Sequence, residues 1–286
     1  MRYLQMMRRF VALVSEPLRC NAPFFVFLYV LGCICAWATL PDVRGAHLYD
    51  NLFPELFLDV YMLALVLTLL PRRVRPWVRG IFYFILYVTA LVDVYCFVKF
   101  HSSLTPTMLL LVGETDTREA GEFLRSCVAP DILFSNVGWV VLLMFIHLLV
   151  TLQLRFPHFV PKNWCRLFWS LLDRFGLMFK RVRPVSQWAV LILLVVSTCY
   201  SVHNKAAFIK LMSGRTIGEV EHTLTEKDKA NLYQPVYRLA FSIYANTLTA
   251  KQVDRLVSRV DKVKVDSCSF RSPNIGLIIG ESYNRH

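Results

Sequence analysis

The sequence predicts an all-α transmembrane bundle of five helices, followed by a linker and the first β-strand of an α/β domain. The chain of 286 residues is 56% hydrophobic and 18% charged, whereas a soluble domain is about 45–50% apolar and about 25% charged. Its apolar residues gather in blocks of about twenty, the length that a membrane-spanning helix needs. A last, shorter apolar run near residue 278 follows a turn signal, which is typical of a strand buried on both faces.

Five apolar blocks can each cross a hydrocarbon core of about 30 Å as a helix. They cover residues 22–40, 54–70, 77–100, 136–154 and 185–202, so residues 1–203 form the predicted transmembrane domain. The first block resembles a cleaved signal peptide in one respect, because Ala36-Trp37-Ala38 has the small-x-small form. We expect a retained helix, since the apolar stretch is longer than that of a signal peptide and further spans follow.

The lysines and arginines predict the orientation of the bundle. Fifteen of them flank the blocks on the side of the N-terminal tail, and four lie in the connections on the other side. The positive-inside rule then places the N-terminus in the cytoplasm and the residues after 203 on the outer face. The net charge of +12 therefore indicates contact with a lipid bilayer and not with nucleic acid.

Two connections are predicted to be structured. Residues 163–183 mix aromatic and basic side chains, which is typical of an interfacial helix on the cytoplasmic surface. Residues 104–128 lie on the outer face and predict a surface helix that begins at Thr105-Pro106.

Residues 204–272 predict an outer-face linker that contains helices. A polar stretch at 213–229 is followed by aromatic residues at helical spacing in 231–246 and by a charged helix at 250–264. Residues 273–286 then begin the α/β domain. Because no domain ends one strand into its sheet, we expect the chain to hold only the start of that domain.

Three acids lie inside the predicted spans, at similar depth near the outer face: Glu55, Asp59 and Asp93. Acids at such positions are costly and are often functional. One interpretation is pairing between helices, for example with Lys99 or the Tyr61 hydroxyl, and the other is an access groove for a zwitterionic lipid. The pattern favours pairing but leaves the groove open.

Other polar and sulfur-bearing side chains suit structural roles. His147 is expected to form a hydrogen bond to a neighbouring helix. Cys35 and Cys96 are expected to be small buried hydrophobes. Cys127 and Cys268 both fall in predicted outer-face segments, which leaves a disulfide between them open.

The end of the predicted strand is a candidate metal site. In open α/β sheets, ligands bind beyond the carboxyl ends of the strands, and Glu281 lies there with Gly280 before it and Ser282 after it. Glycine allows close approach of the backbone, and serine can cap a following helix. A solvated acid at a strand end is the alternative that spacing alone leaves open.

The segment from Asn274 to Ser282, with Arg285 after it, resembles the first strand of the sulfatase-like domain of the alkaline phosphatase superfamily. It is especially similar to bacterial lipopolysaccharide and lipid A phosphoethanolamine transferases, in which an apolar strand ends in Gly-Glu-Ser/Thr. Their layout is also similar, with five membrane helices, a cytoplasmic N-terminus, a linker and a periplasmic domain. The resemblance implies that 273–286 begin a sulfatase-like domain and that Glu281 binds zinc.

A second motif of that family matches the predicted surface helix. Met108, Thr115 and the pair Glu119-Ala120 stand where the family carries Met, Thr and an acidic residue plus Ala. The resemblance implies that Thr115 and Glu119, which share one helix face, bind the phosphoethanolamine headgroup. Leu111 departs from members that carry Asn at that position, which faintly favours core sugars over lipid A as the acceptor.

The resemblance implies a transferase in the bacterial inner membrane. Phosphoethanolamine would pass from phosphatidylethanolamine, by way of a zinc-activated threonine, to a lipopolysaccharide core sugar or lipid A. The family's threonine nucleophile and its Asp-His metal ligands follow the first strand and have no counterpart in these 286 residues. We therefore expect this chain not to catalyse the reaction by itself.

Three alternatives differ in class. A lipoteichoic-acid-synthase-like or other sulfatase-type membrane phosphotransferase shares a similar anchor and a strand that ends in Glu, but the Thr115 and Glu119 motif favours the phosphoethanolamine transferases. An inactive membrane-anchor fragment is the second alternative. A transporter is disfavoured, because the chain shows no inverted repeat and no pair of Gly/Pro-broken helices.

Overall fold

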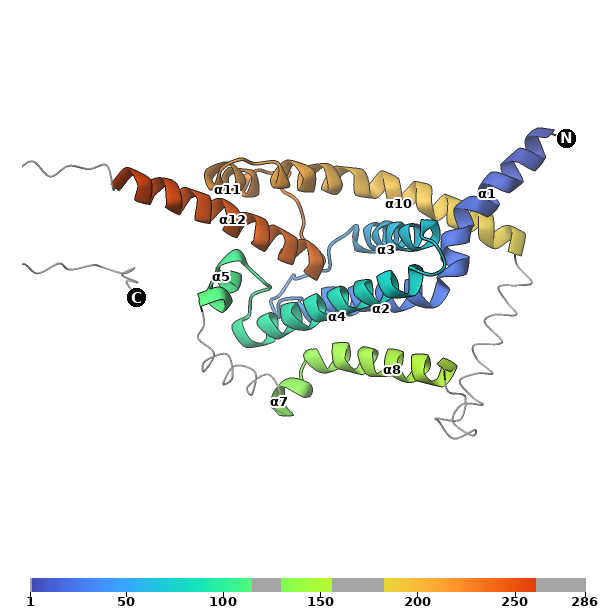
Figure 1. The fold of residues 1–286 in the computed structure, drawn as a ribbon, viewed down its shortest axis with the longest axis horizontal. Coiled ribbons are helices and arrows are strands. Elements are labelled where there is room, and N and C mark those ends of the chain that lie inside the picture. The colour runs from blue at the N-terminus through green and yellow to red at the C-terminus, as the bar shows by residue number, and fades with distance from the viewer. Residues whose placement is uncertain (1, 115–129, 156–182, 261–286) are drawn as a thin grey trace, which may run out of the picture.

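The computed structural model describes residues 2–114, 130–155 and 183–260, and the described residues form helices and no strand (Figure 1). The strand predicted at 273–286 and most of the predicted helices at 104–128 and 163–183 lie outside these ranges. The helices are α1 Arg2–Cys20, α2 Ala22–Ala38, α3 Leu52–Leu69, α4 Arg75–Phe100, α5 Pro106–Glu114, α7 Pro130–Leu133, α8 Val137–Arg155, α10 Arg183–Met212, α11 Ile217–Thr225 and α12 Pro235–Val260.

A helix lies at each of the five positions where the sequence predicts a span. Within the described residues, α3, α4 and the part of α10 from Gln187 to Met212 are long and apolar enough to cross a membrane. The bent pair α1–α2 would be a fourth crossing, and the apolar part of α8, Val137–Leu152, is shorter. The helices are thus consistent with a membrane protein, and the count of five spans stays a prediction.

The first predicted span is the second arm of a bent helix pair. Helices α1 and α2 meet at 71°, and Asn21 lies between them. The Asn21 amide donates to the Thr68 hydroxyl at 3.0 Å and accepts from the Arg79 guanidinium at 2.7 Å. Pro23, in the first turn of α2, has no N–H to continue the hydrogen bonds of α1. The bend is therefore fixed by side chains of α3 and α4.

The described helices pack around two apolar cores. The larger is built from α2, α3, α4 and α8, and includes Phe24, Leu56, Val94 and Val140. The smaller joins the end of α10 to α11 and α12, and consists of Leu211, Val220, Ala230, Phe241, Ala245 and Leu248. Large apolar side chains also point outward, as expected for helices that face lipid: Phe84, Phe145 and Ile192 are examples.

Beyond the fifth predicted span the chain is more helical than the sequence indicates. Helix α10 continues to Met212, and α11 lies inside the stretch 213–229 that we predicted as a polar linker. Helix α12 runs without a break from Pro235 to Val260 and so joins the aromatic stretch 231–246 to the predicted charged helix at 250–264. The residues at that point contain no glycine or proline, and Leu248 is buried in the smaller core.

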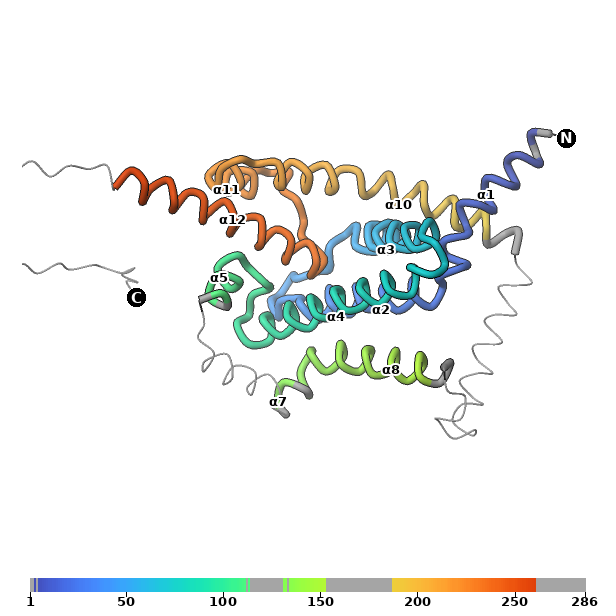
Figure 2. The backbone as a smooth tube through the Cα atoms, in the orientation of Figure 1, coloured from blue at the N-terminus to red at the C-terminus, as the bar shows by residue number. Residues whose placement is uncertain are grey.

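After α10 and α11 the chain returns to the apolar helices at the start of α12. Figure 2 shows the backbone running from α10 through α11 to the N-terminal end of α12, which lies beside α3 and α4. Helix α12 packs against α4 and α5, and the Asn246 amide donates to the Pro106 carbonyl at 3.0 Å. This return places α12 against the acids of the predicted spans.

Candidate functional site

The site residues that the family resemblance implies lie outside the described residues. Thr115, Glu119 and Glu281 fall in 115–129 and 261–286, and so do Cys127 and Cys268. Their roles stay predictions. Within the described residues no group of three or more His, Cys, Asp or Glu side chains could hold a metal ion, so the zinc site also stays a prediction.

The structure does describe the three acids of the predicted spans, and it brings them to one end of the bundle. Glu55 is fully buried in α3. Its carboxylate accepts from the Tyr49 hydroxyl at 2.5 Å and from the Asn204 side-chain amide at 2.7 Å. The Asn204 side-chain amide also donates to the Asn231 carbonyl and accepts from the Asn231 N–H. One α10 side chain therefore connects α3 to the segment that leads into α12.

Asp59, one turn further along α3, holds a second set of partners. The Lys205 ammonium of α10 lies 2.8 Å from its carboxylate, and the hydroxyls of Tyr233 and Tyr237 both donate to it. Lys205 is also 3.9 Å from Glu55. We call these five residues, Glu55, Asp59, Lys205, Tyr233 and Tyr237, the Asp59 cluster. With two carboxylates and one ammonium, it carries a net negative charge when both acids are ionised.

Asp93 of α4 forms a separate pair with Arg238 of α12. The Asp93 side chain is fully buried, and the guanidinium lies 2.5 Å from one carboxylate oxygen. The other oxygen accepts from the Leu104 backbone N–H at 2.9 Å. Arg238 also donates to the Leu232 carbonyl at 2.8 Å. The pair thus connects α4, the start of α12 and the loop before α5.

The tyrosines of this region remain hydrogen-bond donors at neutral pH. Burial, with the Glu55 carboxylate as a second cause, raises the pKa of Tyr49 to about 12. Burial and the nearby Asp59 carboxylate raise the pKa of Tyr233 and of Tyr237 well above the usual tyrosine value. A neutral phenol beside a carboxylate donates a charge-assisted hydrogen bond, and both Tyr233 and Tyr237 donate to Asp59 in this way.

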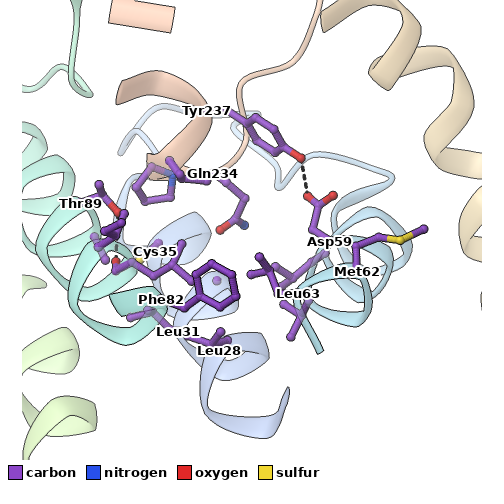
Figure 3. Close-up of a pocket in the computed structure, with 18 residues that line it drawn as sticks. Leu28, Leu31, Cys35, Asp59, Met62, Leu63, Phe82, Thr89, Gln234 and Tyr237 are labelled. Atoms are coloured by element: carbon purple, nitrogen blue, oxygen red, sulfur yellow. Dashed lines mark hydrogen bonds between the residues drawn. The ribbon is translucent and has the colours of Figure 1, made fainter. Parts of the chain in front are cut away.

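Beside the Asp59 cluster is a cavity of about 420 Å³ between α2, α3, α4 and the start of α12. Figure 3 shows the Gln234 side chain reaching into it, with Phe82, Leu28 and Leu31 below and the hydrogen bond from Tyr237 to Asp59 at its rim. Most of its wall is aliphatic or aromatic, and its polar lining residues include Asp59, Thr89, Gln234 and Tyr237. The arrangement is suited to an amphipathic ligand.

The structure decides between the two interpretations of the membrane acids only in part. All three are paired, as the sequence favours, but their cationic partners, Lys205 and Arg238, come from α10 and α12. The Tyr61 hydroxyl instead donates to the Val14 carbonyl. His147 forms the expected contact between helices, with its Nδ1 atom 3.1 Å from the Tyr87 hydroxyl. Asp59 also lines the cavity, which leaves the groove interpretation open.

Sequence reasoning missed Lys205, Arg238 and Gln234. Lys205 had a signal, because it is a lone basic residue directly after a long apolar stretch. Tyr233 and Tyr237 had one too, since their spacing of four places them on one helical face. No local pattern marks Arg238 or Gln234.

Comparison with known proteins does not add a family. No protein-family model, curated protein or solved structure matches this chain. The likeness to phosphoethanolamine transferases therefore rests on the residues quoted for it above.

Proposed function

We propose that this protein belongs to a membrane enzyme that transfers phosphoethanolamine from phosphatidylethanolamine to a lipopolysaccharide core sugar or lipid A. The reaction takes place at the outer face of a bacterial inner membrane. Two sequence motifs support the proposal: the apolar run that ends in Gly280-Glu281-Ser282, and the set Met108, Thr115 and Glu119. The apolar helices support the membrane location.

The attachment of α12 to the apolar helices is the main structural support for the proposal. Its first turns are held by Asp59 and Asp93 through Tyr237 and Arg238. Helix α12 is the last described element before Glu281. The proposed sulfatase-like domain begins after α12, so this attachment would join that domain to the apolar helices. This supports the proposal, because an enzyme with a lipid donor and a lipid acceptor has to work beside a membrane.

The residues of this chain have three roles in the proposed reaction. Glu281 is an anionic ligand of a zinc ion, which lowers the pKa of an attacking hydroxyl and offsets charge on the phosphoryl oxygens. In the proposed site Glu119 faces the ammonium of the donor headgroup, and Thr115, four residues before it, shares the same face of the predicted helix. The helices hold both lipids beside the site.

Mass spectrometry of cell-envelope glycolipids tests the proposal. Cells that carry the complete gene are compared with cells from which it has been deleted. We expect glycolipids heavier by one phosphoethanolamine group only where the gene is present. Identical glycolipid spectra would contradict the proposal, and a gain of glycerol phosphate would identify the lipoteichoic-acid-synthase-like reaction in its place.

A further inference from the structure

The cavity beside the Asp59 cluster has the size and the apolar lining of a site for a hydrocarbon chain. Its walls include Leu28 and Leu31 from α2, Val60 and Leu63 from α3, and Phe82 from α4. Its volume of about 420 Å³ lies within the range of about 300–1,000 Å³ typical of ligand pockets. From Leu28 to Cys35 the α2 wall rises about 10 Å along the helix axis.

The cavity opens on the side that the apolar helices turn outward. Met62 of α3 and Ile85 of α4 both line it, and they are 48% and 43% exposed. In a membrane, that surface faces acyl chains and not water. An acyl chain of a lipid can therefore enter the cavity sideways from the bilayer, between α3 and α4.

The Gln234 side chain, just before α12, offers a hydrogen-bond donor to the cavity. Gln234 is only 8% exposed, and its Nε2 atom is buried with no hydrogen-bond partner among the described residues. A buried amide without an acceptor is destabilising. Figure 3 shows this side chain aimed into the cavity, so an oxygen atom of a bound ligand would satisfy it.

Gly32 keeps the space in which that amide lies. A Cβ atom at position 32 would be 3.2 Å from Gln234 Nε2 and 2.5 Å from a methyl carbon of Leu56. A larger residue at position 32 would push into both. The absence of a side chain here lets the cavity reach the Gln234 amide.

We propose that this cavity binds one hydrocarbon chain of a membrane glycerolipid, whose ester carbonyl accepts a hydrogen bond from Gln234 Nε2. The ester follows from charge: Asp59 stands at the same rim (Figure 3), and its carboxylate repels the carboxylate of a free fatty acid. Lipid binding at this site does not require transferase activity, so the test of the site is independent of the test of the proposed function.

Photocrosslinking in lipid nanodiscs tests the site. The probes are phosphatidylethanolamine and phosphatidylglycerol with a diazirine in one acyl chain, and a free fatty acid with the same diazirine. We expect both diacyl lipids to label peptides from residues 28–35 and 82–90, and the fatty acid to label them less. Labelling spread evenly over the outward faces of α4, α8 and α10 would overturn the site, and equal labelling by the fatty acid would overturn the ester assignment.

Two variants and one control test where the hydrocarbon chain of the lipid binds. Met62→Trp fills the opening, so labelling of both segments should fall; Val66→Trp, one turn along α3 at a 43% exposed position outside the cavity, should leave it unchanged. Gln234→Leu should reduce labelling about two- to tenfold, the effect of one lost hydrogen bond. Equal labelling in Met62→Trp and Val66→Trp overturns the site even if Gln234→Leu does not fold. Full labelling in a folded Gln234→Leu protein overturns the role of the amide.

Discussion

At the scale of single residues, the acids of α3 and α4 differ in how their charge is compensated. Asp93 is fully buried and has one cationic partner, Arg238. Asp59 is 23% exposed in its side chain and has Lys205 and two tyrosine hydroxyls. Breaking a buried ion pair is costly because it leaves the remaining charge unpaired in a medium of low polarity. The two pairs should therefore respond differently to removal of the cation.

Arg238→Met should destabilise the folded protein by about 3–5 kcal/mol, because Asp93 remains buried without its partner. Thermal unfolding in detergent, followed by size-exclusion chromatography, measures the change. Adding Asp93→Asn should recover part of the loss, since an amide oxygen still accepts from the Leu104 N–H. Arg255→Met, at an exposed position of α12, is the control. An equal Tm for Arg238→Met and Arg255→Met would contradict the importance of the pair.

Lys205→Met should lower the Tm less than Arg238→Met does. Asp59 keeps its two tyrosine donors after this change and is partly exposed, so its charge remains better solvated. The same unfolding assay applies, with Lys251→Met as control, because Lys251 lies at an exposed position of α12. A larger loss for Lys205→Met than for Arg238→Met would show that this ranking is wrong.

Glu119→Ala should abolish most transferase activity while expression stays normal, because the donor's ammonium loses its proposed counter-charge. The readout is the phosphoethanolamine content of the glycolipids in cells that carry the variant gene. Glu221→Ala, an exposed acid on α11, is the matched control. Unchanged modification in Glu119→Ala cells would remove this residue from the headgroup site.

At the scale of elements, the sequence predicts the helices well and their partners poorly. Long apolar blocks are a local signal, and a helix lies at each of the five. The bend at Asn21 was not predicted, because it depends on Arg79 and Thr68, which lie far along the chain. Arg238 meets Asp93 across 145 residues for the same reason. Pairing of this kind follows from the packing of α12 and not from any local pattern.

Helix α11 is joined to α10 by a pH-sensitive contact. The hydrogen bond from the Lys210 ammonium is the main cause that holds the pKa of the Glu226 carboxyl below its usual value. Because the folded-state pKa is depressed, the contact stabilises the fold above the unfolded-state pKa, and this contribution is lost as pH falls through the folded-state pKa.

The Tm of the wild-type protein should therefore exceed that of Glu226→Gln at pH 7, and the difference should vanish at a pH below the carboxyl's folded-state pKa. Because the pair is exposed, added salt should also reduce the difference. Thermal unfolding of both proteins across this pH range is the measurement. A difference in Tm that does not change with pH would contradict an ionic contact.

At the scale of the whole molecule, whether α8 crosses the membrane decides on which side of the membrane α12 lies. With α2, α3, α4, α8 and α10 all spanning, the chain after Met212 is on the opposite side from the N-terminus. If α8 did not cross, the two would share a side. The lysine and arginine bias predicts the first arrangement.

Alkaline phosphatase fusions in a bacterial host test this topology. Fusions after Arg44 and after Val260 should be active, because the enzyme requires the oxidising periplasm, and a fusion after Arg73 should be inactive. Immunoblots of each fusion control for expression. Activity after Arg73, or its loss after Val260, would contradict the five-span arrangement.

Phosphoethanolamine transfer in reconstituted vesicles tests the central claim most directly. The product of the complete gene is placed with phosphatidylethanolamine labelled in its headgroup and with lipopolysaccharide as the acceptor. We expect the label to move to the lipopolysaccharide while diacylglycerol is released. Glu281→Gln should stop both, and Glu221→Gln should stop neither. Label that stays on phosphatidylethanolamine with the unaltered protein, or transfer that Glu281→Gln leaves intact, would contradict the claim.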